Sequence, residues 1–327
     1  MSSSISVSAP PLPRSCGTLS EAVVRYLAGG SGSSLPTHVE AEPLSRDLQL
    51  ALTVCYELHY RGFEGIDDDA EWDPDVLRFR RLLERVFLAY LRDNIEAGTD
   101  AFAEMDALSL EPVSGTGPSW YLRDQGTWEQ MREYFAHRSL YHLKEADPHA
   151  WAIPRLQGQA KASFVAVEFD EYGGGRGERL HQRLWADLMQ AAELDSTYLG
   201  YLDRVPAETL AWVNLMSQFG LHRSLRGATV GHFAATEITS SPGSKRFVDG
   251  LTRLGAPDIC AAFYREHVEA DAVHEQILRH DVVANLLRDE PHLEPDVVFG
   301  MRALDFVEDV LGSALVESWK SGRSLLL

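Results

Sequence analysis

Two histidines and an aspartate between residues 263 and 280 have the spacing of a metal-binding helix face. In an α-helix, residues three, four and seven positions apart lie on one side, so His267, Asp271 and His274 form a column. The neighbours of this column, such as Phe263, are mostly apolar, which predicts that the column is buried. Two imidazoles and a carboxylate are costly to bury alone, and a bound cation would compensate all three.

The stretch also allows a metal-free reading, in which the three side chains form a buried hydrogen-bonded chain. A metal site needs further ligands from neighbouring helices, and carboxylates or imidazoles at apolar positions are the candidates. Four residues meet this description: Glu145, Glu171, His181 and Glu237. The mixture of carboxylate oxygen and imidazole is typical of iron or manganese, and the number of ligands favours two ions. Glu178 has ExxH spacing to His181, so spacing alone favours it over Glu171.

The remaining sequence predicts an all-α fold, because period-two alternation of apolar residues is nearly absent. Helices are predicted over residues 19–27, 45–60, 75–96, 127–146, 158–172, 178–193, 206–226, 227–242, 263–280 and 295–319. Pro242 is expected to end the helix that carries Glu237, and Gly173 to Gly175 to interrupt helical structure rather than to cradle phosphate. We expect a single domain over residues 19–327, packed as a helical bundle, after a Ser- and Pro-rich tail (residues 1–18) that is disordered or loosely attached.

Composition argues against several classes of protein. The net charge of -19 disfavours nucleic-acid binding, since no basic patch is evident. Three cysteines without CxxC spacing indicate neither a disulfide framework nor a thiolate zinc site. Asp67 to Asp69 lack the ligand spacing of an EF-hand loop. With no apolar run long enough to span a bilayer and no signal peptide pattern, we expect a cytoplasmic protein without membrane contact.

Five segments resemble the haem-oxygenase-like iron-containing redox enzymes, also called haem-oxygenase-like dimetal oxidases. They are YELHYRGFEGIDDDAEWDP, YHLKEADPHAWAIPRLQGQAKA, DEYGGGRGERLH, GLHRSLRGATVGHFAATEITSS and FYREHVEADAVHEQ. The resemblance covers about residues 40–320, and its ordered combination of carboxylate, glycine-rich break, His and HxxxDxxH is specific. It implies a haem-oxygenase-like helical bundle.

The resemblance also implies the metal ligands. These are Glu171, His181, Glu237, His267, Asp271 and His274, with Glu145 as an extra carboxylate found in some members. It favours Glu171 over Glu178. It further implies two Fe(II) ions, with manganese as an alternative metal, that use O2 without haem. The expected function is oxidation of a small, amino-acid-like substrate in natural-product biosynthesis. The expected reaction is C–H oxidation or desaturation, with or without ring closure. An external electron donor and a homodimer are further expectations.

Three alternatives remain open from the sequence. The first is N-oxygenation of an amine or guanidine. The second is a haem- or tetrapyrrole-binding protein, for which four histidines could serve as the axial ligand: His59, His142, His222 and His232. The third is a metal-free helical interaction module. Arg223 and Arg226 are candidates for binding a substrate carboxylate, and Tyr172 and His232 for supporting the ligands.

Overall fold

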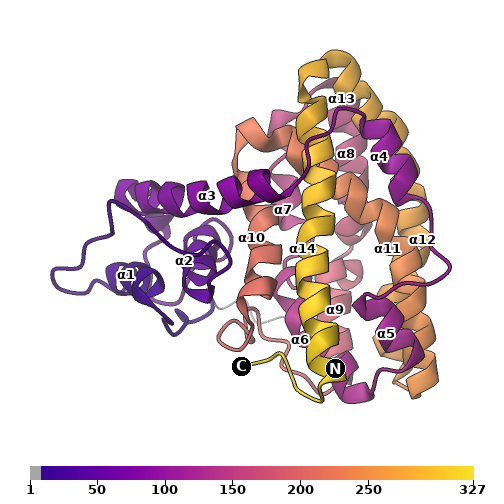
Figure 1. The fold of residues 1–327 in the computed structure, drawn as a ribbon, viewed down its shortest axis with the longest axis horizontal. Helices are drawn as coiled ribbons and strands as arrows, with labels where there is room; N and C mark the ends of the chain where they lie inside the picture. Colours follow the sequence, from indigo (N-terminus) through magenta and orange to yellow (C-terminus); the bar gives the residue numbers. More distant parts are fainter. Residues whose placement is uncertain (1–8) are drawn as a thin grey trace.

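The computed structural model describes residues 9–327, which form helices and no strands (Figure 1). The all-α prediction is confirmed. The α-helices are α1 (Thr18–Leu27), α2 (Arg46–Glu57), α3 (Pro74–Asn94), α4 (Ala101–Leu108), α5 (Pro118–Asp124), α6 (Trp128–His142), α7 (Asp147–Ala150), α8 (Gly158–Glu171), α9 (His181–Ala191), α10 (Ala207–Leu221), α11 (Arg226–Leu254), α12 (Asp258–Ile277), α13 (Ala284–Asp289) and α14 (Glu294–Lys320). Between residues 9 and 327, no helix is long and apolar enough to cross a lipid bilayer.

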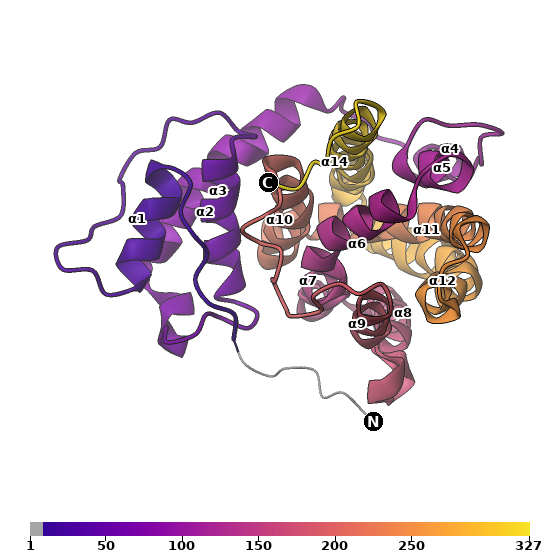
Figure 2. The same cartoon turned by 90° about the horizontal axis from the view of Figure 1, so that it is seen from below.

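Helices α1, α2 and α3 form a unit on one side of the molecule, and α2 packs against α10 (Figures 1 and 2). The first eight residues of the expected N-terminal tail lie outside the described residues. The rest of that tail contacts this unit and the loop before α10. The Pro10 carbonyl accepts a hydrogen bond from the Glu64 amide at 2.8 Å, and the Arg14 amide donates to Asp203 at 2.9 Å.

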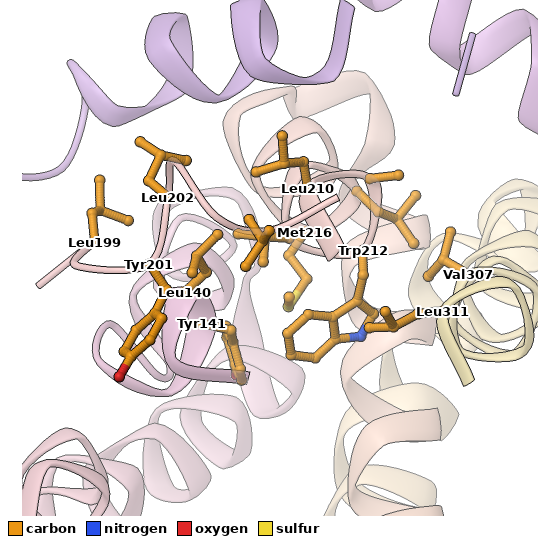
Figure 3. Packing of buried hydrophobic residues seen from close by; sticks show 14 of the residues in the cluster. Leu140, Tyr141, Leu199, Tyr201, Leu202, Leu210, Trp212, Met216, Val307 and Leu311 are labelled. Atoms are coloured by element: carbon orange, nitrogen blue, oxygen red, sulfur yellow. The ribbon is translucent and has the colours of Figure 1, made fainter. Parts of the chain in front are cut away.

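The core between α6, α10 and α14 is built from apolar side chains that project from all three helices (Figure 3). Tyr141 comes from α6, Trp212 and Met216 from α10, and Leu311 from α14, and all four are buried. Leu202, in the connection between α9 and α10, closes this core at one end. These helices form a framework on which the remaining helices are placed.

Helices α11 and α14 are in backbone contact, which requires glycine on both. A Cβ on Gly231 would lie 1.9 Å from the carbonyl oxygen of Val297, and a Cβ on Gly300 would lie 2.1 Å from that of Ala228. No larger residue fits either position without moving a helix. The close packing fixes α11, and therefore the residues that α11 presents to α12.

The prediction that Pro242 ends this helix is wrong, because α11 continues through Pro242 to Leu254. A proline inside a helix removes one hydrogen bond and crowds the carbonyl four residues earlier. Phe247 and Leu251 are buried in the second half of α11, and the Ser241 hydroxyl donates to the carbonyl of Val268 in α12 at 3.1 Å. This tertiary packing offsets the local cost of the proline.

The glycine run between α8 and α9 forms two short 3-10 turns, Gly173–Gly175 and Gly177–Arg179. Gly173 has a φ of 69°, and a Cβ there would lie 2.6 Å from the backbone carbon of Arg179. Only glycine satisfies both demands. The turns bring the end of α8 next to the start of α9, as the sequence interpretation of a helical interruption requires.

Candidate metal centre

The residues predicted as ligands come from five places in the bundle and are all buried. Helix α12 presents His267, Asp271 and His274 on its inner face. Glu171 is the last residue of α8 and His181 the first of α9, while Glu237 lies in the middle of α11 and Glu145 in the turn between α6 and α7. In Figure 2, α6, α8, α9, α11 and α12 lie together in one part of the molecule. The fold therefore brings distant parts of the sequence to one point.

Their side chains form two groups that could each hold a metal ion. The first group is Glu145, Glu171, His181 and His267, and the second is Glu171, Glu237, Asp271 and His274. Within each group, one potential ligand atom from every residue lies within 4.8 Å of the others. Glu171 belongs to both groups, so its two oxygens could contact two neighbouring ions.

Short contacts connect carboxylates and imidazoles within each group. The Glu171 Oε2 atom lies 2.8 Å from Nδ1 of His181, and the Glu237 Oε2 atom lies 3.1 Å from Nδ1 of His274. Glu145 Oε1 lies 3.6 Å from Nε2 of His267. These carboxylates and imidazoles already face one another, and a cation between them would find lone pairs on both sides.

His267 is held in the orientation that a metal ligand needs. Its Nδ1 lies 2.7 Å from the carbonyl oxygen of Phe263, one turn earlier in α12. A carbonyl only accepts, so Nδ1 carries the proton and donates it, which leaves Nε2 as the free position. A backbone carbonyl that fixes the tautomer of a metal-bound histidine is a common feature of metal sites.

Several buried polar atoms in the two groups have no hydrogen-bond partner within the described residues. They are Glu145 Oε2, Glu171 Oε1, His267 Nε2, Asp271 Oδ1 and Asp271 Oδ2. Such atoms are rare in folded proteins because their desolvation is uncompensated. Their number and their mixture of carboxylate oxygen and imidazole nitrogen fit the ligand set that iron or manganese takes. The residues present therefore fit the metal that the sequence predicts.

The electrostatics of the site reflect several carboxylates that are buried close together. Burial, together with the carboxylates of Asp271 and Glu171, raises the pKa of Glu237 well above its usual range. Burial also raises the pKa of Asp271, to about 6. Although burial opposes it, the carboxylates of Asp271 and Glu145 raise the pKa of His267. Protons on Glu237 and Asp271 would reduce the repulsion among the buried carboxylates, and bound divalent ions would do the same in their place.

The other predicted residues lie elsewhere. Glu178 is exposed in the turn before α9, so the structure buries Glu171 instead. Arg223 is exposed, and Arg226 forms an ion pair with Glu290. Tyr172 donates a hydrogen bond to Asp147 at 3.0 Å.

His232, the other candidate for a supporting role, lies in α11 and is buried beside a second histidine. Its Nδ1 lies 3.0 Å from Nε2 of His149, and no hydrogen bond joins it to a predicted ligand. The other histidines considered for haem also have partners: His59 contacts Glu71, and His222 contacts Glu84.

Glu168 and His142 lie beside the centre, although the sequence analysis does not assign either of them to it. Glu168 lies one helical turn before Glu171 and is 2% exposed, and neither of its oxygens has a hydrogen-bond partner among residues 9–327. Burial raises its pKa well above the usual range, with Glu171 and Glu237 adding to the rise. His142 donates a hydrogen bond from Nδ1 to Oε1 of Glu145 at 2.9 Å. The signal for Glu168 was its position in register with Phe164 and Glu171 on the apolar face of α8.

A cavity of about 410 Å³ reaches the centre. Five of the seven predicted ligands line it: Glu145, Glu171, Glu237, His267 and Asp271. Its other walls include the rings of Trp212 and Phe263, and it extends to the half-buried Trp120. A small molecule in this cavity would lie beside the ligand groups.

Two arginines line the cavity, and neither was predicted. Arg138 of α6 makes two hydrogen bonds to the Glu308 carboxylate, at 2.6 and 2.5 Å, and its guanidinium lies 4.2 Å from the Trp212 ring centre. Arg246 of α11 donates to the Ser119 hydroxyl at 2.9 Å. Arg223 and Arg226 are not among the residues that line the cavity.

The segment from residue 132 to residue 308 matches the family model described as iron-containing redox enzyme. This segment is more than half of the chain and contains all seven predicted ligands. The chain belongs to this family of iron-containing redox enzymes. The resemblance stated from the sequence is confirmed, and with it the haem-oxygenase-like, all-α fold.

One curated relative of this iron-containing redox enzyme is the nitrosourea synthase of Streptomyces achromogenes subsp. streptozoticus. The two sequences are 24% identical over 275 residues. The aligned region is 78% of this chain and 58% of the relative, so the chain spans little more than half of the relative's length.

Proposed function

We propose that this protein is a non-haem, two-iron, O2-dependent oxidase of a small, amino-acid-like molecule. The observation that carries this proposal is the pair of buried ligand groups that share Glu171. Carboxylate and imidazole ligands suit iron, with manganese as the alternative metal. Bound Fe(II) would supply the electrons for the reduction of O2, which no side chain of this site provides.

The side chains of the centre would hold and shield the metal. Glu145, His181 and His267 would bind one ion, Glu237, Asp271 and His274 the other, and Glu171 both. The carbonyl of Phe263 would keep the tautomer of His267. The aromatic walls of the cavity would shield the metal on the sides that they cover, which would reduce side reactions with water.

The charged pair in the cavity wall supports an amino-acid-like substrate. Arg138 uses two N–H groups for Glu308, and its buried Nε has no hydrogen-bond partner in the part of the chain that the structure describes. The guanidinium would attract a substrate carboxylate bound in the cavity, while Glu308 keeps the guanidinium in place. A substrate ammonium or guanidinium would be attracted to Asp305, Glu308 and Asp309, which line the same cavity on α14.

We place N-oxygenation first among the reactions. The relative is named for making a nitrosourea, in which a nitrogen atom carries oxygen. Glu145, the extra carboxylate of some family members, lies within the first ligand group. Transfer of one oxygen atom from O2 to nitrogen leaves the second to become water, which takes two protons and two electrons from an external donor. C–H oxidation or desaturation, with or without ring closure, is the alternative.

The test is anaerobic loading with Fe(II), followed by exposure to O2 with a panel of amino acids and a reductant. We expect O2 consumption and a product heavier by one oxygen atom, whereas desaturation would give a product lighter by two hydrogen atoms. His274→Ala should lose iron and O2 consumption together. If the variant retained both its iron and its O2 consumption, the two-iron assignment would be contradicted. A Soret band in the purified protein would also contradict it and would indicate haem instead.

A further inference from the structure

The turn that carries Glu145 has an unusual backbone. Helix α6 ends at His142, and a continued helix would bring the Pro148 ring against the carbonyl of Lys144, four residues earlier. Ala146 has a φ of 71°, in the left-handed region that residues with a Cβ rarely adopt. Such a conformation persists only where the surroundings hold it. The position of the Glu145 carboxylate therefore depends on contacts that hold this turn.

A buried ion pair joins the turn to the N-terminal helical unit. Lys144 is 2% exposed, and its Nζ lies 3.2 Å from Oε2 of Glu57, the last residue of α2, which is fully buried. Tyr198 donates to the other oxygen of Glu57 at 2.7 Å. The Lys144 ammonium also lies 4.1 Å from the ring centre of Tyr60. With both charges satisfied, Lys144 is anchored to the end of α2.

A second connection runs from the same end of α2 to the backbone of the turn. Arg61 Nη2 donates to the carbonyl oxygen of Leu143 at 2.9 Å and to Oε1 of Gln182 at 3.2 Å. Gln182, in the first turn of α9, donates from Nε2 to the carbonyl oxygen of Glu145 at 3.1 Å. The two carbonyls that flank Lys144 are therefore both held by this network.

We propose that Glu57, Arg61 and Lys144 are positioning residues for the metal centre, which hold the Glu145 turn and so determine the affinity of the first ligand group. The inference rests on the proposed function, since it requires Glu145 to bind metal. The proposal gives the N-terminal helical unit a role in metal binding. Glu57 and Arg61 lie before residues 132–308, the segment that matches the family model. Neither residue lines the cavity, so each acts through the turn.

The test is a titration of the metal-depleted full-length protein with Mn(II), in which electron paramagnetic resonance measures the free ion. Wild type should bind two ions. Lys144→Met keeps the length of the side chain and removes the ammonium. Because loss of a supporting contact typically costs about ten- to a hundredfold in metal affinity, one ion should bind that much more weakly while the other changes little. Glu145→Gln should weaken the same ion.

Glu84→Gln is the matched control, because Glu84 is also a buried carboxylate of the N-terminal unit. It pairs with Arg80 at 3.2 Å and His222 at 2.9 Å, outside both ligand groups and the cavity. This variant should bind both ions with wild-type affinity. If it weakened the first ion as much as Lys144→Met, a general loss of stability would explain the effect and the proposal would be overturned.

Lys144→Met leaves the Glu57 carboxylate buried without its partner, which can prevent folding. The double variant Glu57→Gln with Lys144→Met removes both charges and keeps the packing, and circular dichroism checks its fold. It should also bind one ion weakly. Wild-type affinity for both ions in the double variant would overturn the positioning role alone. A wild-type protein that binds no ion, or only one, would overturn the two-metal function as well.

Discussion

Replacing Asp271 by asparagine should stabilise the metal-free protein in a manner that depends on pH. Asp271 is 1% exposed, and burial raises its pKa from 3.8 to about 6 despite the attraction of His267. Between these pH values the unfolded chain has released a proton that the folded protein retains. The stability of the folded state therefore falls as pH rises through this window, and the loss is complete above about pH 6. At about 1.4 kcal/mol per pH unit, the loss amounts to about 3 kcal/mol.

Asparagine has nearly the same shape and no proton to lose. Metal-free Asp271→Asn should therefore match wild type near pH 4 and exceed its free energy of unfolding by about 3 kcal/mol at pH 7. With metal bound the order should reverse, because the variant lacks a charged ligand and the wild-type carboxylate is compensated.

Urea denaturation followed by circular dichroism, from pH 4 to pH 8, measures the difference with and without a chelator. Glu269→Gln is the control, because Glu269 lies on the exposed face of the same helix, α12. It should change the free energy of unfolding by less than about 0.5 kcal/mol at every pH. The reasoning is refuted if metal-free Asp271→Asn is no more stable than wild type at pH 7, or if its advantage does not grow between pH 4 and pH 6.

Three further experiments test other parts of the structure. Glu171→Ala should reduce the binding of both metal ions, whereas Glu237→Ala should weaken mainly one; equal iron content in the two variants would speak against a shared carboxylate. Gly231→Ala should lower the free energy of unfolding by about 3 kcal/mol, because its Cβ would meet the Val297 carbonyl. A free energy of unfolding equal to that of wild type, measured by urea denaturation, would disprove that close contact. Arg138→Lys should raise KM for a carboxylate substrate and leave iron content unchanged. The reason is that lysine cannot be held by the Glu308 carboxylate through two parallel hydrogen bonds. An unchanged KM would show that Arg138 does not bind the substrate.

The choice between Glu171 and Glu178 shows where local spacing is insufficient. Glu178 has the regular ExxH spacing to His181, but the turn conformation after Gly173 leaves Glu178 exposed and places Glu171 2.8 Å from the His181 ring. Within the sequence, only the family resemblance favours Glu171 over Glu178. A glycine with positive φ changes the direction of the chain in a manner that helix periodicity does not describe.

The arginines illustrate a related limit. The sequence offers Arg223 and Arg226 for a substrate carboxylate, but the arginines that line the cavity are Arg138 and Arg246. Arg138 lies on α6, and Arg246 lies in the second half of α11, far along that helix from Arg226 at its start. Pro242 is a third example, since the local rule that proline ends a helix gave way to the packing of the second half of α11.

The sequence by itself determined the helical class, the family and the buried column on α12, because helix periodicity is local and a single segment of 20 residues contains it. It also supplied the residue types that make iron the expected metal. Only the tertiary structure decided that one glutamate belongs to two ligand groups, which arginines face the cavity, and that the end of α2 holds the Glu145 turn. These relations join residues far apart in the chain, and they depend on how helices pack and how glycine and left-handed turns redirect the backbone, which no local pattern encodes.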